Sequence, residues 1–396
     1  MDLEFSDEQR LIRDSAREFL AQACPPASVR AARSDPRGCP RQLWRAMAQL
    51  GWMGLSVPEH YGGSGAGFME LAVLLEETGR VCLPGPFFST VMLGVPCLLE
   101  LGNARQKKAM LPRLARGDLV LGLALQEGGG EFDPSRITLP AQKIKNGFRL
   151  TGTKMFVADA SAADYLICVA RPGIQGQPGK DLALFLVARD APGLHLAPLI
   201  SIDGTQLHEV VFDGVDVPLD NVLSGRAGIW PQLKQILLKA TIGKCAQMVG
   251  GAQHVLDIAV SYAKEREQFN RPIGSFQAIQ HHCVNMLIDL ERARWLTYKS
   301  AAAVVGNDLQ SQQASMTKAW CNHAYRRIVQ LGHQVMGGVG YCEDHELPLY
   351  FRNARMAETA FGDSDTHMEI IADALLGADC PPIAAASERG LAADEL

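Results

Sequence analysis

The residue pattern of this chain changes twice along its 396 residues, and the two changes divide it into three substructures. Residues 1–118 and 227–380 carry apolar side chains at helical spacing, whereas residues 119–226 contain short β-rich runs between glycine, proline and aspartate turns. A chain of this length exceeds what a single hydrophobic core usually organises. We therefore expect an α+β protein with an N-terminal helical domain, a middle β-sandwich or barrel domain and a C-terminal four-helix bundle, followed by a disordered tail at 381–396.

The middle region supplies the β signals. Its runs read LVLGLAL, FRLTGTKMFV, DYLICVA, DLALFLVA and HEVVFDGVDV. Asn146 and Gly147 lie between two such runs and predict a hairpin with a type I′ turn, in which both turn residues have positive φ. The chain shows neither a βαβ alternation nor a GxGxxG motif, so we do not expect a Rossmann domain for a nicotinamide cofactor.

Composition and charge exclude several classes of function. The net charge of −5 and the absence of a basic run argue against a nucleic-acid partner. No apolar run is long enough to cross a bilayer and the N-terminus lacks a signal-peptide core, so we expect a cytoplasmic protein without membrane insertion. The ten cysteines form no CxxC pair, which favours reduced thiols. Residues 281–283 read His-His-Cys, but neighbours on a helix point in different directions, so no metal site is expected.

The segment Tyr262–Gln280 is the most informative stretch for function. Apolar spacing predicts a helix that stops before Pro272, because proline lacks a backbone donor and restricts the residue before it. Arg266 and Phe269 are predicted to lie one turn apart on one face of this helical corner. A cation beside an aromatic ring suits a phosphate joined to a flat heterocycle. A surface arginine beside a core phenylalanine fits the same spacing, so spacing leaves both interpretations open.

A longer pattern distinguishes them. The segment resembles YAKxRxQFGxPIxxFQxxxH of the acyl-CoA dehydrogenase family, and the matching residues are Tyr262, Ala263, Lys264, Arg266, Gln268, Phe269, Pro272, Ile273, Phe276, Gln277 and His281. The resemblance continues in HQVMGGVGY at 333–341 and in residues 352–355, and it covers the chain from about Phe5 to Leu376. It is strongest to a bacterial branch that includes subunits of heteromeric enzymes. It implies the same order of helical, β and helical domains that the pattern predicts.

The resemblance implies FAD as the cofactor. Carried over by motif, Arg266 would pair with the FAD pyrophosphate and Phe269 would line the adenine channel. Gln334, Gly337 and Gly338 would form the complementary wall from a neighbouring subunit, which implies a dimer of dimers. The two glycines could equally serve to end a helix.

In the β domain the resemblance places three residues near the flavin. Gln126 opens a loop through Asp133 that corresponds to the family's TEPxxGSD segment, of which only Glu127 and Asp133 are kept. Phe156 and Ala158 correspond to positions in the family's W-I-(S/T)-N stretch. Phe156 keeps an aromatic ring, whereas Ala158 lacks the hydroxyl donor.

The chemistry implied by the resemblance is oxidation of an acyl-CoA to a 2-enoyl-CoA, with hydride transfer to flavin N5 and a carboxylate that removes the α-proton. The three positions where relatives carry this glutamate fall on Phe361, Ala240 and Gln247, and none is acidic here. Gln247 keeps the shape of the base without its ability to accept the proton. Asp363 is a nearby substitute, and capping of the last helix is the alternative role for it.

Several hypotheses remain open on the sequence. The chain is an acyl-CoA dehydrogenase with an unconventional base, or the base-lacking subunit of a heteromeric enzyme acting on fatty, steroid or aromatic acyl groups. Electron-transfer flavoprotein is then the expected electron acceptor. The alternatives are a structural subunit that binds flavin or CoA without catalysis, and a flavin enzyme of another reaction, such as a desulfinase-like relative.

Overall fold

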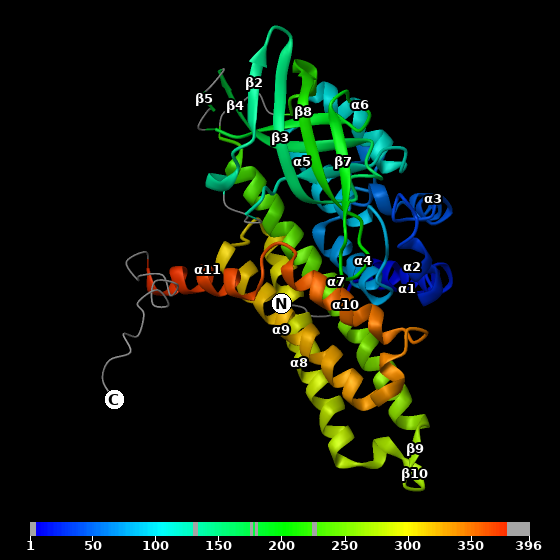
Figure 1. Ribbon diagram of the computed structural model, residues 1–396. Coiled ribbons are helices and arrows are strands. Elements are labelled where there is room, and N and C mark those ends of the chain that lie inside the picture. Colours follow the sequence, from blue (N-terminus) through cyan, green and yellow to red (C-terminus); the bar gives the residue numbers. More distant parts are fainter. Residues whose placement is uncertain (1–4, 130–133, 175–176, 179–180, 224–227, 378–396) are drawn as a thin grey trace, which may run out of the picture.

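The computed structural model describes residues 5–129, 134–174, 177–178, 181–223 and 228–377. Helices at the N-terminal end, a curled sheet in the middle and long helices at the C-terminal end follow one another along the chain (Figure 1). This is the expected order of substructures. The expected domain border at 226–227 and the tail at 381–396 lie outside the described residues.

The buried helix of the N-terminal region is α4, which packs against α1 and against α7 (Trp230–Glu265) and α8 (Gln277–Val305) of the C-terminal bundle. The N-terminal helices are α1 (Asp7–Ala23), α2 (Pro26–Ala32), α3 (Arg41–Gln49), α4 (Phe68–Arg80), a π-helical turn (Ser89–Gly94), α5 (Val95–Leu101) and α6 (Ala104–Ala115). The predicted cap of α1 is confirmed: Gln9 N–H donates to Ser6 Oγ at 3.2 Å and Ser6 N–H donates to Gln9 Oε1 at 3.1 Å.

The middle region forms one curled sheet over the described residues. Its order is β1-β4-β2-β3-β8-β7, with β5 and β6 also paired to β4. The strands are β1 (Leu121–Ala124), β2 (Pro140–Ile144), β3 (Gly147–Ala158), β4 (Tyr165–Ile174), β5 (Gln177–Pro178), β6 (Ala183–Ala188), β7 (Leu194–Leu199) and β8 (Leu207–Pro218). Of these, β2, β5 and β7 have no counterpart among the five runs quoted from the sequence. The residues of β7, LHLAPL, are half-buried or exposed, and one histidine and one proline interrupt its apolar pattern.

The hairpin between β2 and β3 is present, but the prediction of its turn is wrong. Ile144 pairs with Gly147, so the two loop residues are Lys145 and Asn146. Neither Asn146 nor Gly147 is among the described residues with positive φ. Gly147 is needed for a different reason: a Cβ there would lie 2.1 Å from the Val217 carbonyl oxygen on β8.

The C-terminal region is a bundle of long helices. Its members are α7 (Trp230–Glu265), α8 (Gln277–Val305), α9 (Ser311–Met336), α10 (Leu347–Thr359) and α11 (Ser364–Leu376), the last of which projects from the body of the chain (Figure 1). Glycines bring α4 of the N-terminal domain against α7: a Cβ on Gly79 would lie 1.9 Å from the Gln247 carbonyl oxygen. Among the described helices, none combines the length and apolar character that a bilayer span requires.

The helical corner predicted after α7 is also wrong in detail. The helix ends at Glu265, and the chain forms a small hairpin from β9 (Glu267–Gln268) and β10 (Arg271–Pro272). Phe269 and Asn270 connect them with φ values of 56° and 62°, the positive pair of a type I′ turn. Arg266 and Phe269 therefore do not share a helix face. Pro272 and the strong turn preference of Asn270 favour the hairpin over another helical turn.

Candidate functional site

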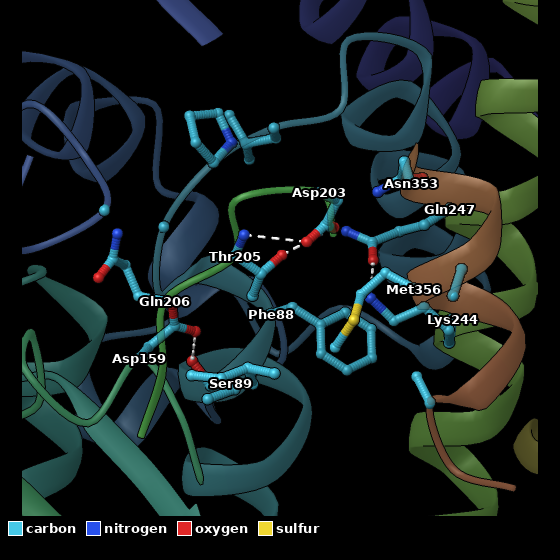
Figure 2. Close-up of a pocket in the computed structure, with 18 of the residues that line it drawn as sticks. Phe88, Ser89, Asp159, Asp203, Thr205, Gln206, Lys244, Gln247, Asn353 and Met356 are labelled. Carbon is cyan, nitrogen blue, oxygen red and sulfur yellow. Dashed lines mark hydrogen bonds between the residues drawn. The ribbon is translucent and has the colours of Figure 1, made fainter. Parts of the chain in front are cut away.

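A cavity of about 550 Å³ lies where the three substructures meet. Its walls come from α4 and the π-helical turn, from β1 and β3 with the loop between β7 and β8, and from α7 and α10. Figure 2 shows Phe88 and Ser89 on one wall, Asp159 and Gln206 on another, and Lys244, Gln247 and Met356 on the helical side. Residues of all three domains are thus required to form it.

Gln247 lines this cavity from the middle of α7, and two hydrogen bonds hold its amide. Lys244 Nζ donates to Gln247 Oε1 at 2.7 Å (Figure 2). Gln247 Nε2 donates to Thr78 Oγ1 at 3.1 Å. The Thr78 hydroxyl donates in turn to the Leu75 carbonyl oxygen at 2.8 Å, so a lone pair faces the glutamine amide. The surroundings of residue 247 therefore match an amide rather than a carboxylate.

Lys244 is a cation inside the cavity. Its Nζ lies 4.2 Å from the centre of the Phe88 ring, a cation–π contact. Burial lowers the pKa of the Lys244 ammonium to about 8, while Asp203 and Asp159 oppose that shift through their negative charge. Sequence reasoning missed this residue, although its spacing from Ala240 and Gln247 places all three on one face of α7.

Two carboxylates also line the cavity. Asp159 directly follows β3 with a φ of 57° and accepts a hydrogen bond from Ser89 Oγ at 2.5 Å (Figure 2). Burial raises the pKa of the Asp159 carboxyl to about 6, although the hydrogen bond from Ser89 and the charge of Lys244 lower it. Asp203 lies in the loop between β7 and β8, where it accepts from Thr205 N at 2.9 Å and Thr205 Oγ1 at 2.8 Å. The sequence carried no signal for Asp203, because the loop only reaches the cavity in the folded chain.

The three residues expected beside the flavin do come together. Gln126, Phe156 and Ala158 all line the cavity. Met155 N–H donates to the Gln126 carbonyl oxygen at 2.9 Å, which fixes the loop after β1 against β3. Phe156 has a φ of 56° and is 46% exposed, so its ring is presented to the open space at the cost of backbone strain.

The other positions that carry a base in relatives have different surroundings. Phe361 lines the cavity and packs against Phe88 with ring centres 5.8 Å apart. Ala240 is fully buried. Asp363 is the N-cap of α11: it accepts from Thr366 N at 2.9 Å and Thr366 Oγ1 at 2.7 Å, and it is not among the residues that line the cavity. The capping role considered for Asp363 is confirmed.

The residues expected at the adenine end of FAD lie elsewhere on the chain. Arg266 and Phe269 are exposed on the β9–β10 hairpin, at the end of the bundle remote from the sheet (Figure 1). Phe269 is 87% exposed and strained at positive φ, and within the described structure no ion pair engages Arg266. A strained, exposed aromatic ring near an unpaired cation fits an anionic aromatic ligand shared with a second chain.

Gln334, Gly337 and Gly338 are exposed and do not line the cavity either. Gly337 follows the last residue of α9 with a φ of 59°, so ending the helix accounts for this glycine. A Cβ on Gly338 would meet nothing within 4 Å inside the chain. No packing in the described structure therefore demands a glycine at 338, which is compatible with close approach of a ligand or a second chain.

Three family models cover most of the chain. Residues 6–118 match the acyl-CoA dehydrogenase N-terminal domain, residues 122–215 the middle domain and residues 230–376 the C-terminal domain. The chain is 31% identical over 378 residues to a benzylmalonyl-CoA dehydrogenase of Aromatoleum aromaticum, covering 94% of this chain and 99% of that protein.

Solved structures give the same result. Butyryl-CoA dehydrogenase from Megasphaera elsdenii superposes with a TM-score of 0.87 at 26% identity, covering 95% of this chain and all of that one. A chain of the ChsE4-ChsE5 complex from Mycobacterium tuberculosis superposes with a TM-score of 0.85 at 25% identity, covering 96% of this chain and all of that one. The predicted fold class is thereby confirmed.

Proposed function

This chain belongs to the acyl-CoA dehydrogenase family, oxidoreductases that act on CH–CH bonds, and from that premise we propose that it is the base-lacking subunit of a heteromeric FAD-dependent enzyme. In this role it contributes to flavin and acyl-CoA binding, while a partner subunit carries the carboxylate that removes the α-proton. The acyl-CoA is oxidised to the 2-enoyl-CoA.

One observation supports this proposal above the others. Gln247 occupies the cavity at a position where relatives carry the base, and its amide is held by a donor on one side and an acceptor on the other. An amide cannot accept the proton that a carboxylate takes from the α-carbon. Phe361 and Ala240, at the two other positions, are apolar. Asp363, the acidic substitute considered from the sequence, is engaged as a helix cap.

Family membership confirms the expected FAD cofactor, and the residues at hand fit it. When bound, FAD supplies the acceptor for the hydride that leaves the β-carbon. Gln126, Phe156 and Ala158 would line its ring end, and Arg266 would neutralise its pyrophosphate. Because the ring-end and adenine-end residues lie far apart on one chain, the adenine end would be completed by Gln334, Gly337 and Gly338 of a neighbouring subunit.

The assembly we propose is a dimer of dimers with a homologous partner, and electron-transfer flavoprotein is the proposed electron acceptor. Support for two kinds of subunit comes from the similarity to a chain of the ChsE4-ChsE5 complex, an assembly of two proteins. A carboxylate supplied by the partner subunit would remove the need for one here.

The test is purification of this chain alone and after co-expression with the product of its neighbouring gene, followed by flavin content, light scattering and dehydrogenase assay. The proposal expects FAD and turnover in the co-purified complex, with turnover lower by about 10²-fold or more in the chain alone. Full activity of the isolated chain would instead identify an unconventional base within it. A complex that binds flavin and shows no turnover with any acyl-CoA would favour a structural subunit.

A further inference from the structure

We propose that Lys244 forms an anion-binding subsite in the cavity and that it receives a carboxylate carried by the acyl group of the substrate. The acyl-CoA would then be the thioester of a dicarboxylic acid, with its free carboxylate within a few bonds of the reacting carbons. This inference rests on the proposed function, because it assumes that the cavity receives an acyl-CoA.

The contacts of Lys244 leave its positive charge without a counter-ion. Two neighbours are seen at the ammonium group: Gln247 Oε1 at 2.7 Å, a neutral acceptor, and the face of the Phe88 ring with its centre at 4.2 Å. Within the described part of the chain, no carboxylate oxygen lies within 4.0 Å of Lys244 Nζ. An ammonium group has three donors, so at least one N–H remains available to a ligand.

Without a ligand, the burial of the Lys244 ammonium costs free energy. Removing a charge from water costs free energy unless an opposite charge or hydrogen bonds replace the solvent. Burial lowers the pKa of Lys244 to about 8 although the negative charges of Asp203 and Asp159 oppose the shift, so the cost of burying this charge is only partly compensated. The part of the side chain that remains accessible opens into the cavity that it lines. A carboxylate entering that cavity would supply the missing counter-charge.

The acidic groups around Lys244 are occupied by other partners. Asp203 accepts hydrogen bonds from the N–H and hydroxyl of Thr205 and from Ser201 Oγ at 3.2 Å, all within its own loop. Asp159 accepts from Ser89 and lies across the Phe88 ring from Lys244 in Figure 2. Cys82 and Cys245 also face Lys244 but remain thiols, because burial raises the pKa of Cys82 and of Cys245 well above the usual value. Neither carboxylate therefore takes the place of a ligand anion.

The position of Lys244 indicates that it would contact the acyl end of a bound acyl-CoA. Gln247, its hydrogen-bond partner, is the position at which the resemblance places the base for the α-carbon, and the Phe88 ring lies between Lys244 and Asp159 in Figure 2. Leu93, Leu237, Met248 and Met356 add apolar wall to the same cavity. A short carbon chain ending in a carboxylate matches this combination of apolar surface and a cation on α7 that has no carboxylate within 4.0 Å.

The experiment compares acyl-CoA pairs that share the CoA moiety and carbon count and differ in the carboxylate: succinyl-CoA with butyryl-CoA, and glutaryl-CoA with pentanoyl-CoA. Isothermal titration measures their binding to the flavin-loaded protein, in its complex where it needs a partner. We expect the carboxylated member of a pair to bind about ten- to a hundredfold more tightly, because a charge-assisted hydrogen bond is gained. Lys244→Met should abolish the preference and Lys244→Arg should retain part of it. Lys234→Met, the same charge change at an exposed site on α7, should leave it intact.

Proton uptake on ligand binding is a second measurement, and a lysine with only a structural role would not change it. A carboxylate bound beside Lys244 raises its pKa, so at pH 8 to 9 the carboxylated ligand should be bound with uptake of a proton, seen as a dependence of the heat on the buffer. Equal binding of both members of each pair would overturn this inference and leave the proposed function intact. Failure of every acyl-CoA to bind would overturn both.

Discussion

Lys244 Nζ and Gln247 Oε1 lie 2.7 Å apart across one turn of α7, so the side chain at a position expected for the base is held by a cation. Thr78 accepts from the other end of the same amide at 3.1 Å. The Thr78 hydroxyl donates its proton to the Leu75 carbonyl oxygen. A carboxylate at residue 247 would therefore place one oxygen against a lone pair of the Thr78 hydroxyl, unless that hydroxyl rotated. The site is thus adapted to glutamine.

Gln247→Glu should create or raise dehydrogenase activity, because it places a carboxylate on the cavity wall where relatives use one. General-base catalysis contributes about 10²–10⁴-fold, which sets the largest gain to expect. The neighbouring ammonium would keep the new carboxylate ionised and weaken it as a base, so the gain should be larger in the Gln247→Glu, Lys244→Met double variant with a neutral acyl-CoA. Stopped-flow reduction of the flavin measures it.

A matched control for this experiment is Gln247→Asn, which keeps an amide and adds no base. Its flavin reduction should not exceed that of the unmodified chain. A Gln247→Glu variant that binds FAD and acyl-CoA normally yet reduces flavin no faster would argue that the α-proton is not within reach of residue 247.

Asp159→Asn should stabilise the protein at neutral pH and leave it unchanged in acid. The carboxyl pKa is raised from 3.8 to about 6 in the folded state, so the folded protein binds the extra proton and loses stability as pH rises through that window. Asparagine removes this penalty, keeps an acceptor for Ser89 and tolerates the φ of 57°. The gain should be absent below about pH 4 and reach at most roughly 3 kcal/mol above pH 6. Chemical denaturation across this pH range measures it, and a constant difference at every pH would contradict the assignment.

Asp363→Ala should destabilise α11 without changing the chemistry. The lost cap is worth about 1 kcal/mol, whereas Asp363→Asn keeps an acceptor for Thr366 and should be close to neutral. Two measurements on both variants distinguish a helix cap from a catalytic base: hydrogen exchange over α11 and the rate of flavin reduction. Loss of flavin reduction in Asp363→Asn with unaltered exchange would identify Asp363 as a base despite its cap.

Arg266→Ala should lower FAD occupancy about tenfold or more, because it removes a charge-assisted phosphate contact worth roughly 1.5–3 kcal/mol. The flavin absorbance of the purified protein and an FAD titration of its apo form give the affinity. Lys264→Ala is the control, since it removes the same charge from an exposed site in the last turn of α7. Equal affinities of the Arg266 variant and the unmodified protein would remove Arg266 from the FAD site.

The part of the cavity wall that comes from the β domain was predictable from motifs. Gln126, Phe156 and Ala158 were identified through local sequence patterns, and they do line one cavity. Lys244 could have been found by extending the helical face that carries Ala240 and Gln247. Asp203 and Thr78 could not, because each reaches the cavity from an element distant in sequence, and no local pattern encodes such a contact.

The sequence by itself determined the order of helical, β and helical regions, the cap of α1 at Ser6 and the absence of a carboxylate at residues 240, 247 and 361. These three features depend on residue identity and short-range periodicity, and both can be read from the amino-acid sequence. Tertiary structure alone decided that Phe269 sits in a hairpin turn and that Gly147 serves the approach of β8. It also decided that Thr78 on α4 meets Gln247 on α7, because packing between glycine-lined helices brings together residues far apart in the chain.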